Sequence, residues 1–290
     1  MLLPIQQNLT REQGDTYSLV LSAVGIAHQI HQEEAGRAIW VDEADEAAAR
    51  LHIEKYEAEN RQPLPDASSE TARIQFADGA IVALLLLLLH MLVSPNQHHF
   101  IERYGASAAK ILSGEIYRTA TALLLHSDAV HLVGNMAGIT LFGAVVCSIN
   151  GYGLGWLLIL FSAMLGNGLN AHLHQALHMS IGASTAVFSA VGLLAAHQFW
   201  RKIQQPGQRV KAWLPMAGGI ALLAMLGTGA GRVDVMAHLF GFVCGFAIQI
   251  LYQTLLWIES RTELPPSQQP TCLWAAIFIM GISILWPLLR

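Results

Sequence analysis

The strongest constraint on the fold of this chain is a series of apolar runs that begins at residue 76. A helix needs about 20 apolar residues to cross a bilayer, and an open sheet in lipid would leave backbone groups unpaired. Seven runs approach this length: Phe76–Val93, Ala129–Ser148, Leu154–Leu173, Gly182–Trp200, Ala212–Thr228, Val235–Trp257 and Cys272–Leu289. These runs predict an all-α polytopic membrane protein.

Charged residues are concentrated before this series. Residues 1–75 hold 13 of the 20 acidic and 6 of the 16 basic residues, so a polar segment precedes an apolar one. The net charge of −4 provides no basic surface for phosphates, which excludes a nucleic-acid-binding protein. Three cysteines, Cys147, Cys244 and Cys272, all lie in apolar runs and predict neither a disulfide framework nor a metal cluster.

The polar segment is predicted to be a small cytoplasmic α+β module and linker, residues 1–75. Met1–Thr10 lacks the basic and apolar regions of a secretory signal, so we expect the module to stay where it is synthesised. Strands are predicted at Tyr17–Val24, Ile26–His31 and Arg37–Val41, and a helix at Glu43–Glu59 with Asp42 as its N-cap. Asn60–Glu70 has the composition of a linker.

Basic residues between the fourth and fifth runs indicate the side that faces the cytoplasm. Arg201, Lys202, Arg209 and Lys211 lie in this loop, and positive charge marks cytoplasmic loops. Alternate crossings then place the N-terminus in the cytoplasm and the long loop between the first two runs outside. The sequence predicts an integral, multi-pass protein of a bacterial-type inner (plasma) membrane.

Several polar side chains lie inside the apolar runs, where a bilayer makes them costly and a function is the first explanation. His131 and Asn135 are one helical turn apart on one face of the second run. Both side chains can therefore reach the same point.

A serine and a histidine occupy two other runs. Ser184 stands at the start of the fourth run, and Phe188 follows one turn later on the same face. In the sixth run His238 shares a face with Gly241 and Gly245, and small residues let another helix approach closely. Ser184 is thus predicted to meet His238 across a close helix contact.

Together these residues supply the parts of a serine hydrolase. A serine nucleophile needs a base within hydrogen-bonding distance and donors directed at the oxyanion. His238 is the candidate base, and His131 and Asn135 are the candidate donors. Taken singly, each residue has a simpler explanation, because a lone serine usually bonds its own helix and lone glycines are packing residues.

A metal site is the alternative role for the histidines. His172, His174 and His178 lie close together in the sequence. We expect them in a short loop, facing water or lipid headgroups, with no carboxylate partner nearby. The sequence therefore predicts no metal and no cofactor.

The motifs resemble those of rhomboid intramembrane serine proteases, in residue type and in order along the chain. The matching segments are His126-x4-His131-x3-Asn135, Gly182-Ala183-Ser184, Ala237-His238-x2-Gly241-x3-Gly245 and, in the first outer loop, Glu115-Ile116-Tyr117-Arg118. The family most often has glycine after its serine, whereas here Thr185 follows, and we expect its hydroxyl to bond backward to its own chain. The resemblance covers about residues 76–258.

The resemblance implies a six-helix catalytic core at residues 76–258. It does not cover residues 259–290, where the apolar run itself predicts a linker and a seventh transmembrane helix. It implies that a Ser184–His238 dyad without a third acid cleaves single-span transmembrane substrates within the lipid bilayer. The Ser184 backbone N–H, His131 and Asn135 would bind the oxyanion. Supporting roles are implied for Phe188 packed on His238, Gly182 beside the substrate, His126 near the cavity mouth, Arg118 in the outer loop, and Gly241 and Gly245 in the helix contact.

Three other functions fit parts of the pattern. A pseudoprotease would bind membrane clients without cutting them, but it usually lacks the serine or the histidine. A transporter would use the polar residues as a pathway, and the inverted repeat that would support it is not evident. A scaffold would have no use for several polar groups carried into lipid.

The orientation is testable with reporter fusions. A reporter joined after Arg209 should report the cytoplasm, and one joined between Gly105 and Ser113 should report the outside, because the basic loop marks the inner face. Alkaline phosphatase and green fluorescent protein fusions measure the two sides. The reverse pattern would move Ser184 to the inner surface.

Overall fold

The computed structural model describes residues 1–33, 36–60, 74–174, 178–227, 234–261 and 263–289. The chain divides into two compact units, residues 1–71 and residues 72–290, called the N-terminal unit and the helical unit below. Each is described by itself.

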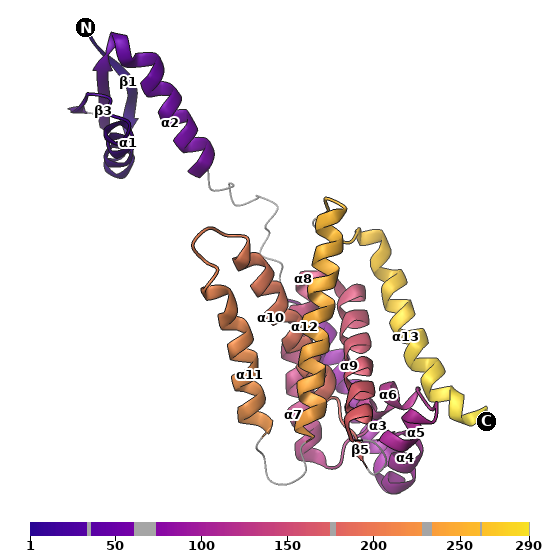
Figure 1. Ribbon diagram of the computed structural model, residues 1–290. Coiled ribbons are helices and arrows are strands. Elements are labelled where there is room, and N and C mark those ends of the chain that lie inside the picture. The colour runs from indigo at the N-terminus through magenta and orange to yellow at the C-terminus, as the bar shows by residue number, and fades with distance from the viewer. Residues whose placement is uncertain (34–35, 61–73, 175–177, 228–233, 262, 290) are drawn as a thin grey trace. The chain divides into compact units, whose positions relative to one another are not determined.

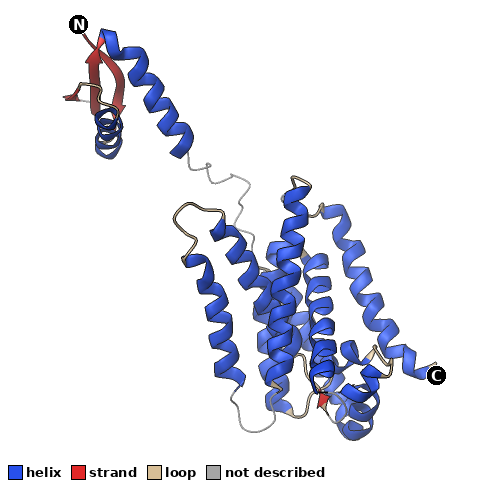
Figure 2. Ribbon diagram, in the orientation of Figure 1, coloured by secondary structure: helices blue, strands red, loops and turns tan. Residues whose placement is uncertain are grey.

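The N-terminal unit combines one sheet with two helices (Figure 2). Its elements are β1 (Leu2–Leu9), α1 (Arg11–Ala23), β2 (His28–Glu33), β3 (Gly36–Asp42), the 3-10 turn η1 (Glu43–Asp45) and α2 (Glu46–Asn60). The antiparallel sheet has the order β1-β3-β2. Leu21, Ile39, Val41 and Ile53 are almost fully buried where the helices cover the sheet.

The predicted strand Tyr17–Val24 is wrong, because Tyr17 lies inside α1. A capping box starts this helix: Thr10 Oγ1 accepts from the Gln13 N–H at 3.2 Å, and Gln13 Oε1 accepts from the Thr10 N–H at 3.0 Å. Tyr17 and Leu21, one turn apart, then form the buried face. The strand β1, which pairs with β3, was not predicted.

The other elements of this unit lie close to their predicted positions. β2 and β3 overlap the strands predicted at residues 26–31 and 37–41. Asp42 accepts a hydrogen bond from the Ala44 N–H at 3.3 Å, and the predicted helix begins there as a 3-10 turn before α2 continues it.

The helical unit contains the apolar runs. From residue 76 the elements are α3 (Phe76–Val93), η2 (Ser94–Asn96), α4 (Gln97–Tyr104), β4 (Ala106–Ser107), α5 (Ala108–Leu112), α6 (Arg118–Thr121), η3 (Ala122–Leu124), α7 (Ala129–Gly138), the π-helical η4 (Ile139–Gly143), α8 (Ala144–Asn150), α9 (Tyr152–His174), β5 (Met179–Ser180), α10 (Ser184–Ile203), η6 (Lys211–Trp213), α11 (Leu214–Gly227), α12 (Val235–Ile258), η7 (Pro266–Gln268), α13 (Gln269–Leu285) and η8 (Trp286–Leu288). Figure 1 shows them as a helical bundle.

Five of these segments are long and apolar enough to cross a membrane. They are Phe76–Tyr104, Ala129–Asn150, Tyr152–His174, Val235–Ile258 and Pro266–Leu288. The fifth predicted run contains a shorter apolar helix, Lys211–Met225. The fourth, α10, carries Arg201 and Lys202 in its last turn, which makes it less apolar. The chain is thus a polytopic helical protein whose helices suit a membrane.

The most extensive helix contact in the bundle is between α10 and α12, which lie side by side in Figure 1. A Cβ added at Gly245 would collide with the Ser189 carbonyl oxygen, and one at Gly241 would lie 2.5 Å from the Thr185 carbonyl oxygen. A Cβ at Gly192, on α10, would collide with the Phe242 carbonyl oxygen of α12. Only glycine permits this separation of the two backbones.

The last helix, α13, is attached to the bundle near both of its ends. Gln269 Oε1 accepts from the backbone N–H groups of Gly153 and Leu154, each at 3.0 Å, at the start of α9. Beyond the other end of α13, the Pro287 carbonyl accepts from Arg103 Nη2 at 2.5 Å.

Two glycine substitutions test the close contact. Gly245→Ala should destabilise the protein by about 1–3 kcal/mol, because the added methyl overpacks the α10–α12 contact. Gly218→Ala is the matched control: no atom lies within 4 Å of its added Cβ, and alanine favours a helix by about 1 kcal/mol. Thermal unfolding in detergent measures both. Equal Tm values for the two variants would contradict the packing described here.

Candidate active site

Ser184 begins α10, and the backbone just before it is tightly held. The Gly182 N–H donates to the Ala122 carbonyl at 2.9 Å. Gly182 has φ +123°, and a Cβ there would lie 2.6 Å from His131 Nε2 and 3.5 Å from Asn135 Nδ2. Glycine is therefore required for both conformation and space. Ser184 therefore starts its helix two residues after Gly182, which lies against His131 and Asn135.

His131 and Asn135 occupy one face of α7, as predicted from their spacing. Asp128 caps this helix by accepting from the His131 N–H at 2.9 Å. Ser127 Oγ lies 3.2 Å from His131 Nδ1. Asn135 is buried, and its Nδ2 has no hydrogen-bond partner among the described residues. An amide donor without an acceptor thus lies beside the segment that leads into Ser184.

His126 lies deeper than a residue at a cavity mouth. It is only 2% exposed, and its Nε2 accepts from the Ala183 N–H at 3.3 Å. Its ring packs edge-on against His131 with centroids 5.3 Å apart. Burial lowers the pKa of His126 to about 3, so the imidazole is neutral at pH 7. His126 therefore acts as a fixed acceptor that holds the residue before Ser184.

His238 lies on α12 against the first turns of α10. Its ring stacks on Phe188 with centroids 4.6 Å apart and an interplanar angle of 21°. The side chain is buried, and Nδ1 has no hydrogen-bond partner within the described part of the chain. Because Ser184 lies one turn before Phe188 on the same face, the serine and the histidine occupy facing sides of the α10–α12 contact. Among the described residues, no hydrogen bond joins them.

Thr185 bonds across to a neighbouring helix rather than backward to its own chain, which corrects the prediction. Its Oγ1 donates to Asn167 Oδ1 on α9 at 3.0 Å, and Asn167 Nδ2 donates to the Thr119 carbonyl at 2.8 Å. Asn167 was not among the residues predicted for the site. An amide inside an apolar run was the signal that marks it.

Arg118 connects the segments of the loop between α3 and α7. It is 2% exposed, and its Nε lies 2.6 Å from Glu115 Oε2. Its Nη1 donates to the Glu102 and Gly105 carbonyls, each at 3.0 Å. Burial raises the pKa of Glu115, but hydrogen bonds from Arg118 and Tyr117 outweigh this effect and leave the pKa below its usual value. This carboxylate is therefore ionised and pairs with a buried guanidinium.

The histidines considered for a metal site do not all lie in a loop, although the rings of His174 and His178 stack with centroids 4.1 Å apart. His172 and His174 belong to the last turn of α9. His178 has a carboxylate partner, contrary to the prediction, since its Nε2 lies 2.6 Å from Asp234 Oδ2. The described residues contain no group of three side chains that could hold a metal ion.

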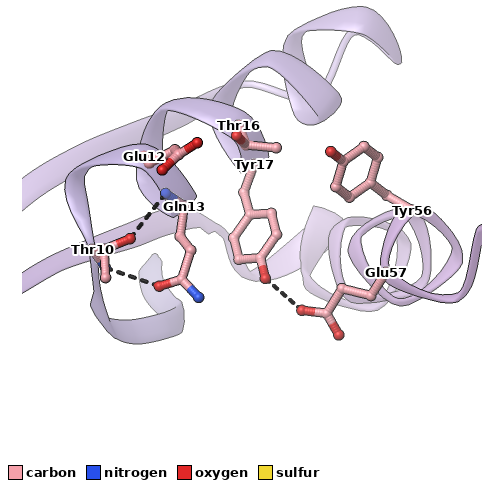
Figure 3. Close-up of a pocket in the computed structure, with 7 residues that line it drawn as sticks. All are labelled: Thr10, Glu12, Gln13, Thr16, Tyr17, Tyr56 and Glu57. Carbon is pink, nitrogen blue, oxygen red and sulfur yellow. Dashed lines mark hydrogen bonds between the residues drawn. The ribbon is translucent and has the colours of Figure 1, made fainter. Parts of the chain in front are cut away.

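A separate cleft of about 610 Å³ lies on the N-terminal unit (Figure 3). It is lined by Thr10, Glu12, Gln13, Thr16, Tyr17, Tyr56 and Glu57. The Tyr17 hydroxyl donates to Glu57 Oε1 at 2.5 Å, and this bond is the main reason that the pKa of Tyr17 rises to about 12. The cleft contains none of the residues predicted for the catalytic site.

Comparison with known proteins shows that the chain is similar to members of one family. Residues 113–254 match the model of the Rhomboid domain. The chain is 30% identical over 212 residues to rhomboid-like protease 3 of Toxoplasma gondii. The aligned region covers 71% of this chain and 73% of that protein. It is 26% identical over 142 residues to the putative rhomboid protease YdcA of Bacillus subtilis (strain 168), covering 49% and 69%. RHOMBOID-like protein 7 of Arabidopsis thaliana is 27% identical over 179 residues, covering 57% and 54%.

Proposed function

Because this chain belongs to the rhomboid family, we propose that it is an intramembrane serine endopeptidase with a Ser184–His238 dyad. The observation that carries the proposal is the stacking of His238 on Phe188, one turn from Ser184, across a contact that glycines make close. Ser184 and His238 are both present, which favours an active protease over a pseudoprotease.

The chemistry proceeds in two steps. His238 removes the hydroxyl proton as Ser184 Oγ attacks the carbonyl carbon of the scissile peptide bond, and it then passes that proton to the leaving amine. Water next attacks the acyl-enzyme with His238 as the base, which releases the carboxylate product and restores the serine. No carboxylate takes part as a third catalytic residue, because packing on Phe188 orients the imidazole.

The oxyanion is bound by three donors on two helices. The Ser184 backbone N–H lies at the N-terminus of α10, where free N–H groups and the helix dipole favour negative charge. Asn135 supplies its unpartnered Nδ2, and His131 supplies its imidazole from the same face of α7. Gly182 keeps the chain close to both side chains, and His126 and Arg118 hold the surrounding segments.

The substrates are proteins with a single transmembrane span. They enter sideways from the bilayer and unwind locally to expose the scissile bond, preferably after a small residue. The protein lies in a bacterial-type inner (plasma) membrane, with its N-terminal unit in the cytoplasm and Ser184 toward the outer face. The reaction needs no cofactor and no metal.

Substitutions separate the roles of nucleophile, base and oxyanion donor. Ser184→Ala and His238→Ala should each abolish cleavage of a transmembrane reporter by the purified protein. Asn135→Ala should be milder, because loss of one oxyanion donor costs roughly 10²–10³ in rate, or about 2.7–4 kcal/mol. A fluorophosphonate probe should label the wild type, label Asn135→Ala slowly and leave Ser184→Ala unlabelled. Wild-type cleavage by Ser184→Ala, free of other proteases, would exclude the mechanism.

The N-terminal unit is expected to be dispensable for the chemistry. A chain that begins near Arg73 keeps every residue of the site and should cleave the reporter at a rate within about threefold of the full chain. The control is the same truncated chain carrying Ser184→Ala. A folded, membrane-inserted truncation without activity would show that this unit is part of the working enzyme.

A further inference from the structure

Asp234 is the N-cap residue of α12, and it has no role in the dyad mechanism. We propose that Asp234 is a positioning residue, whose carboxylate ties the helix that carries His238 both to α9 and to the segment that leads into Ser184. The inference deepens the proposed function and rests on it, since it names what aligns the two halves of the dyad.

The Asp234 carboxylate joins three segments of the helical unit. Oδ1 accepts from the Ala237 N–H at 3.0 Å and so caps α12. Oδ2 accepts from Asn170 Nδ2 on α9 at 2.7 Å, and it lies 2.6 Å from Nε2 of His178. Helix α12, helix α9 and the residue before β5 therefore share one anionic group.

The first turn of α12 transmits this restraint to the catalytic base. The His238 N–H donates to the Asp234 carbonyl at 3.2 Å, so the N-cap residue Asp234 and His238 are the two ends of one turn. No described side chain bonds His238 Nδ1. The direction of the imidazole is thus set by the orientation of this turn and by the stacking on Phe188.

The same carboxylate restrains the approach to the nucleophile. His178 immediately precedes β5, and its carbonyl accepts from the Ala108 N–H at 2.9 Å. β5 pairs with β4, and the Gly182 N–H is bonded to Ala122. Few residues separate this anchored strand from Ser184, so the segment has little freedom once His178 is fixed to Asp234.

The junction is shielded from water. The side chains of Asp234 and His178 are 16% and 26% exposed, and Asn170 is fully buried. Burial raises the pKa of Asp234, but hydrogen bonds from His178, the Ala237 N–H and Ser180 outweigh this effect and lower the pKa. The carboxylate is therefore charged at neutral pH. Its removal would leave the buried Asn170 amide without an acceptor.

The decisive variant is Asp234→Ser. Serine is also a favourable N-cap, so α12 keeps its start, but it has no second oxygen for Asn170 and His178. We expect kcat for the transmembrane reporter to fall roughly 10- to 100-fold with KM nearly unchanged, because a small misplacement of reacting groups costs this much. Diethyl pyrocarbonate should modify the loosened His238 faster than in the wild type, as measured by mass spectrometry.

Variants of the partner distinguish positioning from general stability. His178→Ala should lower kcat about tenfold, and His178→Gln, whose amide can still donate to Asp234, should restore most of it. The double variant Asp234→Ser, His178→Ala should be no slower than Asp234→Ser alone, because both changes break one junction. His172→Ala is the matched control, since this exposed histidine lies on α9 between Asn170 and His178 in the sequence and should leave kcat unchanged.

Three outcomes would overturn the inference: wild-type kcat in Asp234→Ser, equal losses in His178→Gln and His178→Ala, or an unchanged rate of His238 modification. Failure of the proposed function looks different, because then the wild type itself would not cleave the reporter or react with a fluorophosphonate. The rate of His238 modification tests the positioning in either case.

Discussion

The site depends on how closely two helix backbones approach within the bundle. In lipid there is little hydrophobic gain in bringing helices together, so association relies on packing and hydrogen bonds. The glycines of α12 and Gly192 of α10 remove the side chains that would separate the two backbones. The stacking of His238 on Phe188 and the facing position of Ser184 both follow from this separation. Bulkier residues there would move His238 and Ser184 apart while leaving every polar group present.

The polar side chains of the bundle bond mainly to backbone groups and in part to one another, and they form a framework around a few unsatisfied atoms. Thr185 is held by Asn167, Ala183 by His126, and the loop between α3 and α7 by Arg118. Against this background, the Asn135 amide and His238 Nδ1 are buried and unpartnered in the described part of the chain. Buried groups without partners are costly, and they are common where a protein must bind something that forms only during a reaction.

Much of the site was visible in the sequence because its residues lie at helical spacings. His131 and Asn135, or Ser184 and Phe188, share a face by periodicity alone, and a polar group in an apolar run is easily recognised. The contacts of Asp234, Asn170 and His178 were not visible, because they join residues far apart in the chain and depend on how three segments dock. The strand predicted at Tyr17–Val24 failed for a local reason: the capping box of Thr10 and Gln13 outweighed the β-branched and aromatic composition.

Helix α13 supplies a hydrogen-bond acceptor to the start of α9. The first backbone N–H groups of a helix have no partner within it, and here Gln269 of α13 accepts from two of them at the start of α9. The cap of one helix is therefore supplied by another that lies more than a hundred residues later in the chain. A chain that ended after α12 would leave these N–H groups of α9 without their acceptor. Helix α13 therefore contributes to the stability of the start of α9.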